Sequence, residues 1–190
     1  MTNSLLKIRA GTGRLGPYQH SKTQFDCSNM DQTTLRSTAQ ALGIGTAFFM
    51  SGVYFGSSYL AINPLLSLPI NESVRIFSDL YHAGASFIVP LAIGSTAANA
   101  LAAYISLVRR RRMLFVAAAV AAMGTLGYTG LAMFPNINRL LEIRDMNGSE
   151  IQGVQKLEVV HRLTVWKEQN YVRAGLAFSS GVLALVATFR

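Results

Sequence analysis

Residues 79–112 constrain this chain more than any other stretch. They read DLYHAGASFIVPLAIGSTAANALAAYISLVRRRR, with no Lys, Arg, Asp or Glu between Asp79 and Arg109. A run of about 20 apolar residues crosses the hydrocarbon core of a bilayer, and a soluble core helix rarely runs that long without a charge. Frequent Gly, Ala, Ser and Thr are typical of closely packed membrane helices, which also tolerate a proline such as Pro90. The stretch therefore predicts a transmembrane helix.

The four arginines at its end predict an orientation. Short loops rich in Lys and Arg stay on the cytoplasmic side of a membrane. Arg109–Arg112 then mark the cytoplasmic end of the helix, and His82 lies near the opposite end. We expect both termini to be cytoplasmic and the protein to reside in an endomembrane, the endoplasmic reticulum or vesicles.

Composition supports a membrane protein. Charged residues make up 14% of the 190 residues and hydrophobic residues 51%, whereas soluble domains carry about 25% charged residues. The net charge of +8 is compatible with nucleic-acid binding. Because the positive residues gather in the N-terminal tail and beside the apolar runs, we predict no nucleic-acid partner and a lipid bilayer as the surroundings.

Three further apolar runs bring the predicted number of spans to four. We expect an all-α, four-helix transmembrane bundle (residues 37–190) after a disordered cytoplasmic tail (residues 1–36). The spans cover about residues 37–62, 79–108, 113–134 and 170–189, and an amphipathic helix covers about 151–168. Pro135 is expected to end the third span. We expect Gly45, Gly52 and Gly56 to pack against a neighbouring helix.

Polar and aromatic side chains gather at the predicted outer end of every span. They are Tyr54, Ser57, Ser58, Tyr81, His82, Asn136, Asn138, Trp166, Asn170 and Arg173. The cytoplasmic halves hold few such groups, and a channel or transporter would need them along its whole path. The asymmetry therefore predicts a site at the outer rim, although Trp166 could instead be an interfacial anchor.

Two ionisable residues stand out within the predicted spans. His82 can exchange protons near neutral pH, and an ionisable residue in a membrane helix is a functional candidate by default, although His82 could also cap its helix. Arg173 is the only charge in the last span. We expect it to face inward and to be held by Asp79, Asn138 or Asn170.

Signs of a metal centre, a disulfide or a modification are sparse. The single cysteine, Cys27, cannot form an internal disulfide. His82 and His161 are isolated in the sequence, so a metal site that uses both is a weak alternative. Two glycosylation triplets begin at Asn71 and Asn147 on the predicted outer side, which predicts a glycoprotein.

Three blocks of residues resemble a known family. They are Leu80-Tyr81-His82-Ala83-Gly84 with Pro90 downstream, Tyr128-Thr129 followed by MFPNINRLL at 133–141, and Trp166-x-x-x-Asn170-x-x-Arg173. Over about residues 37–190 the chain resembles the DUF1772 membrane family, and within it the fungal anthrone oxygenases, small tetraspan proteins of aromatic polyketide pathways. Ile137 departs from the pattern, because the family commonly has Asn there and only Asn138 matches.

The resemblance implies oxidation of an anthrone to an anthraquinone by O2, with no further cofactor. His82 would then be the general base, and Asn170, Asn138 or Arg173 would stabilise the enolate oxygen. Tyr81, Trp166 and Tyr54 would bind the flat substrate.

A non-enzymatic tetraspan scaffold or lipid-binding protein is the alternative. In that case the outer polar residues would face lipid or head groups. The enzyme hypothesis instead predicts that His82, Asn170 and Arg173 converge on one pocket.

Overall fold

The computed structural model describes residues 24–146, 151 and 153–190, and within those ranges it contains helices and no strand. The elements are α1 (Gln24–Gly56), the π-helical segment η1 (Ser57–Ala61), α2 (Ile62–Leu65), α3 (Ile70–Tyr104), α4 (Arg109–Tyr128), the π-helical segment η2 (Thr129–Met133), α5 (Phe134–Asp145) and α7 (Lys156–Phe189). The prediction of an all-α bundle is confirmed.

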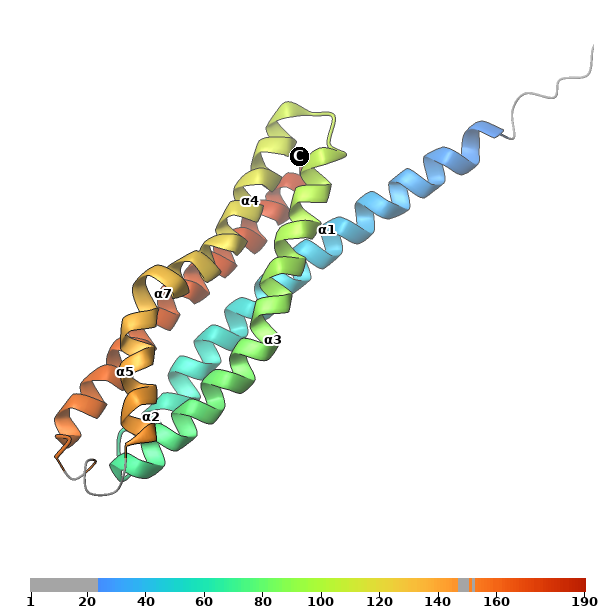
Figure 1. Cartoon of the computed structure of the whole chain (residues 1–190). Coiled ribbons are helices and arrows are strands. Elements are labelled where there is room, and N and C mark those ends of the chain that lie inside the picture. Colours follow the sequence, from blue (N-terminus) through green and yellow to red (C-terminus); the bar gives the residue numbers. More distant parts are fainter. Residues whose placement is uncertain (1–23, 147–150, 152) are drawn as a thin grey trace, which may run out of the picture.

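Four rods form the bundle (Figure 1): α1 with η1 and α2, then α3, then α4 with η2 and α5, and finally α7. Both α1 and α4 pack against α3 and α7, so the order around the bundle is α1, α3, α4, α7. At one end, called here the arginine end, lie the turn from α3 to α4, the four arginines Arg109–Arg112 that begin α4, and the C-terminus. At the other, called the α5 end, lie α2, α5 and the start of α7.

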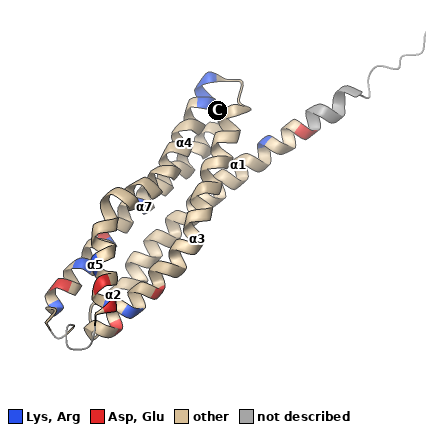
Figure 2. Cartoon of the chain, in the orientation of Figure 1, with Lys and Arg blue, Asp and Glu red and all other residues tan. Residues whose placement is uncertain are grey.

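The protein is an integral membrane protein. Three segments, Ile70–Tyr104, Arg109–Asp145 and Lys156–Phe189, are long and apolar enough to cross a membrane. Charged residues concentrate at the two ends of the bundle and along the start of α1 (Figure 2), as a hydrocarbon layer around the middle requires. The first rod packs into the bundle from Ala39 onward, and its crossing of the membrane as a fourth span remains a prediction.

Several boundaries differ from the sequence-based prediction. Residues 24–36 begin α1, while residues 1–23 of the predicted tail lie outside the described chain. α3 starts at Ile70, well before residue 79, and the predicted amphipathic helix joins the last span as one helix from Lys156. Pro135 does not end the third rod. It lies in the first turn of α5, directly after η2, where the hydrogen-bond register changes and its missing N–H costs little.

The buried core changes character along the bundle. At the arginine end the cluster consists of small residues and one ring: Ala39, Ala102, Ala103, Phe115, Ala118, Ala184 and Ala187. At the α5 end it consists of large residues: Ile62, Leu65, Val74, Phe77, Met133, Ile137, Leu140, Ile143, Val159, Leu163 and Trp166. A third cluster of Met50, Tyr54, Ile88, Ala92, Ala174 and Ala177 completes the core.

The glycines predicted to pack on a neighbouring helix do not do so. A Cβ at Gly45, Gly52 or Gly56 would meet no atom of the described residues within 4 Å. Gly43 makes the close approach instead, because a Cβ there would lie 2.8 Å from Oδ1 of Asn99 on α3. The small-residue spacing was visible in the sequence, but the face of α1 that turns inward was not.

Candidate active site

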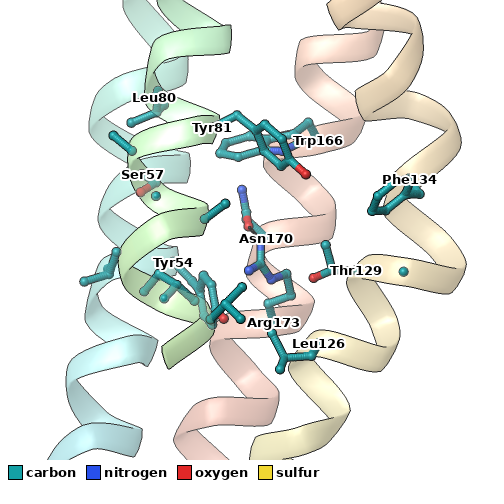
Figure 3. A pocket seen from close by; sticks show the side chains of 17 residues that line it. Tyr54, Ser57, Leu80, Tyr81, Leu126, Thr129, Phe134, Trp166, Asn170 and Arg173 are labelled. Carbon is teal, nitrogen blue, oxygen red and sulfur yellow. Dashed lines mark hydrogen bonds between the residues drawn. The ribbon is translucent and has the colours of Figure 1, made fainter. Parts of the chain in front are cut away.

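A cavity of about 430 Å³ lies inside the bundle, towards the α5 end (Figure 3). All four rods contribute to its wall, and most of the lining is apolar. The lining residues are Val53, Tyr54, Ser57, Leu80, Tyr81, Ala83, Gly84, Ala85, Ile88, Val89, Leu126, Thr129, Gly130, Phe134, Trp166, Asn170 and Arg173.

Both π-helical segments border this cavity. Ser57 lies in η1, and Thr129 and Gly130 lie in η2. A π-helical turn holds more residues than an α-helical turn, so it rotates the side chains that follow it, and such segments are frequent at functional sites. Ser58 anchors the η1 turn, since its hydroxyl donates to the backbone oxygens of Tyr54 at 3.0 Å and Lys167 at 3.1 Å. Both helix distortions therefore lie in the wall of the cavity.

Arg173 places a positive charge in the cavity wall. Its Nη1 donates to Oδ1 of Asn170 at 2.9 Å, and its guanidinium carbon lies 4.0 Å from the centre of the Tyr54 ring. The ion pairs found within the described chain all involve other arginines, so no carboxylate neutralises this one. Of the three partners predicted for Arg173, the structure supplies Asn170.

Several hydrogen-bond donors around Arg173 are buried without a partner. They are Nε of Arg173, Nδ2 of Asn170, Nε1 of Trp166 and the hydroxyl of Tyr54, counted within the described residues. A buried donor left unpaired costs about 1–3 kcal/mol. Because the four residues that carry these donors line one cavity, the site is suited to an oxygen acceptor with negative charge.

Aromatic rings form the wall nearest the α5 end. Trp166 packs edge-on against Phe77 at 5.3 Å, and Phe77 stacks on Tyr81 at 6.4 Å between ring centres. Figure 3 shows Tyr81 and Trp166 on one side of Asn170 and Arg173, with Tyr54 on the other. Flat apolar surface and polar donors thus face the same space.

The structure brings together most, but not all, of the predicted site residues. The cavity wall includes Tyr54, Tyr81, Trp166, Asn170 and Arg173. His82 does not join them, so the predicted convergence of His82, Asn170 and Arg173 is wrong. The His82 side chain is exposed, and its Nδ1 donates to the backbone oxygen of Ser78 at 2.8 Å. Successive helical residues are about 100° apart, which carries residue 82 away from the inward-facing Tyr81.

Asn138 is also outside the cavity. It is exposed on α5, whereas Asn136 is buried and its Nδ2 donates to the backbone oxygen of Arg162 at 2.9 Å. Ile137, the position that departs from the resemblance, belongs to the large-residue core.

The remaining predictions concern surface positions. His161 is exposed, and within the described residues no group of three or more His, Cys, Asp or Glu is arranged to hold a metal ion. Asn71 is exposed at the start of α3, so its glycosylation stays a prediction. Asn147 lies outside the described residues.

Sequence reasoning missed much of the apolar wall. Ala85 and Ile88 of α3 and Gly130 of η2 were not singled out, and Phe134 was named only within a block of the resemblance, although all four line the cavity. The small side chains at positions 83–85, directly after His82, were an available signal of free space beside the helix. We find no sequence signal for the two π-helical segments.

A comparison with protein-family models gives one match. The model described as Anthrone oxygenase matches residues 77–183, more than half of the chain. The matched part runs from α3 into α7 and contains the cavity residues of three of the four rods. Searches of curated proteins and of solved structures found no match.

Proposed function

The chain belongs to the anthrone oxygenase family, and from that premise we propose that it oxidises the methylene carbon of an anthrone with O2 to give an anthraquinone. One observation carries the proposal. Arg173, which no carboxylate of the described chain neutralises, and Asn170 line an apolar cavity with aromatic walls, and each carries a buried N–H without a partner in the described chain. This arrangement suits a flat ketone that becomes an oxyanion during the reaction.

The cavity has a suitable size and shape. Its volume of about 430 Å³ lies within the range of about 300–1,000 Å³ usual for small-molecule sites. Tyr81 and Trp166 offer ring faces and edges to a planar tricyclic ligand. Substrates of this kind are hydrophobic aromatic polyketides, which dissolve in a bilayer.

Arg173 and Asn170 act in the first step. When a base removes one proton from the methylene carbon, the electron pair delocalises through the ring system to the ketone oxygen, which becomes an enolate. Nε of Arg173 and Nδ2 of Asn170 donate to that oxygen. The neutral ketone gains less from a buried positive charge than the enolate does, so these contacts favour ionisation over mere binding.

Oxygen then reacts with the electron-rich carbon. The enolate gives one electron to O2, and the substrate radical and superoxide combine to form a carbon–oxygen bond. The peroxide takes up a proton. Loss of the second methylene proton breaks the O–O bond, releases hydroxide and leaves the new carbonyl. In total, a CH2 group and O2 give a C=O group and water.

The identity of the base is a separate part of the proposal. The described cavity wall contains no imidazole and no carboxylate. His82, the predicted base, keeps Nε2 available on the exposed surface, since Nδ1 donates to Ser78. We therefore propose that water takes the methylene proton inside the cavity, and that any proton transfer by His82 takes place outside the cavity.

The test is quinone formation by purified protein from emodin anthrone under air. We expect Arg173→Met to lower turnover by about 10²–10³-fold, the usual cost of losing an oxyanion donor. His82→Ala should lower it by only about threefold or less, because its side chain does not reach the substrate. If Arg173→Met, with normal helix content, turns over as fast as wild type, the enolate role is wrong. If the wild type and Arg173→Met both form no quinone but still bind lipid, the scaffold alternative gains support.

Cellular placement belongs to the same proposal. The arginine end, with Arg109–Arg112, would face the cytoplasm and the cavity would lie nearer the luminal side of an endomembrane. The triplet that begins at Asn147 tests this orientation, because only a luminal loop becomes glycosylated: a glycan present on the wild type and lost from Asn147→Gln would support it.

A further inference from the structure

The residues that line the cavity are more deeply buried on two of its sides than on the others. Towards α1 and α7 its wall is buried, since Tyr54, Trp166 and Asn170 expose 2%, 4% and 1% of their surface. Towards α3 and the η2–α5 segment it is exposed, since Val89 exposes 40% and Phe134 47%. The same residues thus line the interior and reach the outer surface of the bundle.

We propose that the cavity opens sideways into the bilayer, through a window between α3 and the η2–α5 segment, and that Gly130 keeps this window open. The window is the route by which a flat aromatic ligand passes between lipid and cavity. The inference rests on the proposed function for the kind of ligand, and on the exposed lining for the route.

The depth of the window supports entry from lipid. At ~1.5 Å per helical residue, Val89 lies about 15 Å from Asp79 along α3, and Gly130 lies a similar distance before Arg139. The hydrocarbon core is about 30 Å thick. The uncharged run of each helix therefore holds the window well below the charged α5 end, where water would be the neighbouring phase.

Gly130 occupies the rim without filling it. Leu126, Gly130 and Phe134 follow one another at intervals of four along the continuous α4–η2–α5 rod, and all three line the cavity. A Cβ at position 130 would meet no described atom within 4 Å. Close helix packing therefore does not explain this glycine, and a large side chain has room to extend across the rim between its two neighbours.

Gly127 provides a matched control one turn earlier on α4. It is exposed, a Cβ there would also meet no described atom within 4 Å, and it does not line the cavity. A leucine at either position removes one helical glycine and adds the same apolar volume to the lipid-facing surface. Only the leucine at position 130 stands at the rim.

The single tryptophan permits a test that does not depend on turnover. Trp166 is the only tryptophan of the chain and lines the cavity, so anthraquinone that enters should quench its fluorescence. Protein in detergent micelles is mixed rapidly with anthraquinone, and the quenching rate is followed. Rising micelle concentrations make transfer between micelles fast enough not to limit the rate.

We expect Gly130→Leu to slow quenching at least about tenfold. The added side chain crowds the rim of the window and so raises the free-energy barrier to ligand entry. Gly127→Leu should stay within about twofold of wild type, since its side chain adds no contact to the rim. Phe134→Ala, which removes a ring from the rim, should speed quenching. Equal rates for the wild type and all three variants, or equal slowing by the two leucine substitutions, would contradict the proposed window.

This readout separates the two proposals. If anthraquinone never quenches Trp166 in the wild type, the cavity does not take a flat aromatic ligand. The proposed function then fails, and so does the assignment of that ligand to the window. If quenching is strong but insensitive to position 130, the proposed function stands and the route is wrong.

Discussion

The two halves of the bundle solve the same packing problem differently. In the arginine-end half, alanines fill the interface and glycine allows helix contact: Gly43 lies against Asn99, and a Cβ at Gly181 would lie 3.0 Å from the Phe48 ring. In the α5-end half the core residues are large, and the glycines that line the cavity, Gly84 and Gly130, have free space beside them. Two glycines therefore allow close helix contact in one half, and two others border the cavity in the other half.

The comparison shows how a bundle of apolar helices can hold a cavity without losing cohesion. Small residues let helix backbones approach closely in the arginine-end half. Large residues at the opposite end pack α5 against α3 and α7 and form a cap, to which Arg139 on α5 adds a hydrogen bond by donating to Glu158 on α7. The cavity lies between the two packed regions, next to the π-helical segments.

The largest expected effect compares two of the buried asparagines, Asn170 and Asn99. Asn170→Ala should lower kcat/KM for anthrone oxidation by about 10²–10³-fold, because it removes a donor to the enolate. Asn99→Ala, in the arginine-end half, should change kcat/KM per folded molecule by less than about threefold, because it is remote from the cavity. Steady-state quinone formation measures both. Similar losses for the two variants would mean that the halves are not functionally distinct.

Next in size is the effect of filling glycine positions. Gly43→Val should lower the free energy of unfolding by about 1–3 kcal/mol, since the new side chain collides with Asn99. Gly130→Ala should leave it unchanged or raise it by up to about 1 kcal/mol, because alanine favours helix and meets open space. Denaturant titration in detergent, followed by circular dichroism, distinguishes them. A neutral Gly43→Val would contradict close packing there.

A smaller effect is expected from one cavity hydroxyl. Tyr54→Phe keeps the ring beneath the Arg173 guanidinium but removes a buried hydroxyl that has no partner in the described chain. We expect kcat/KM to fall by about tenfold or less, the value of one neutral hydrogen bond. Tyr104→Phe, on the exposed surface near the arginine end, is the control and should be silent. Unchanged activity in Tyr54→Phe would remove this hydroxyl from substrate binding.

The smallest effect concerns the two ion pairs at Glu158, of which the one with Arg139 joins α5 to α7. Glu158 accepts hydrogen bonds from Arg139 and Arg162, each at 3.0 Å, with all three side chains about a third exposed. Glu158→Gln should therefore lower the free energy of unfolding by less than about 1 kcal/mol, with the loss shrinking at high salt. Glu72→Gln on exposed α3 surface is the reference. A loss of several kcal/mol would show that these charges hold the cap together.

Much of the fold could be predicted from the sequence. Lipid permits only long apolar helices or closed barrels to span it, so uncharged runs ending at charges such as Arg109 mark the rods without reference to any neighbour. Boundaries were less accurate. Pro135 was predicted to end a helix. The rod nevertheless continues, because the proline lies in the first turn of α5, just past η2.

The candidate site was predicted in composition and only partly in geometry. Sequence placed Tyr54, Tyr81, Trp166, Asn170 and Arg173 at the same end of the bundle, since level along a helix follows from residue number. It could not decide how each helix is rotated about its axis, because rotation depends on which partners pack against it. The tertiary structure decided that: it turned His82 and Asn138 outward, and it opened the cavity beside η1 and η2.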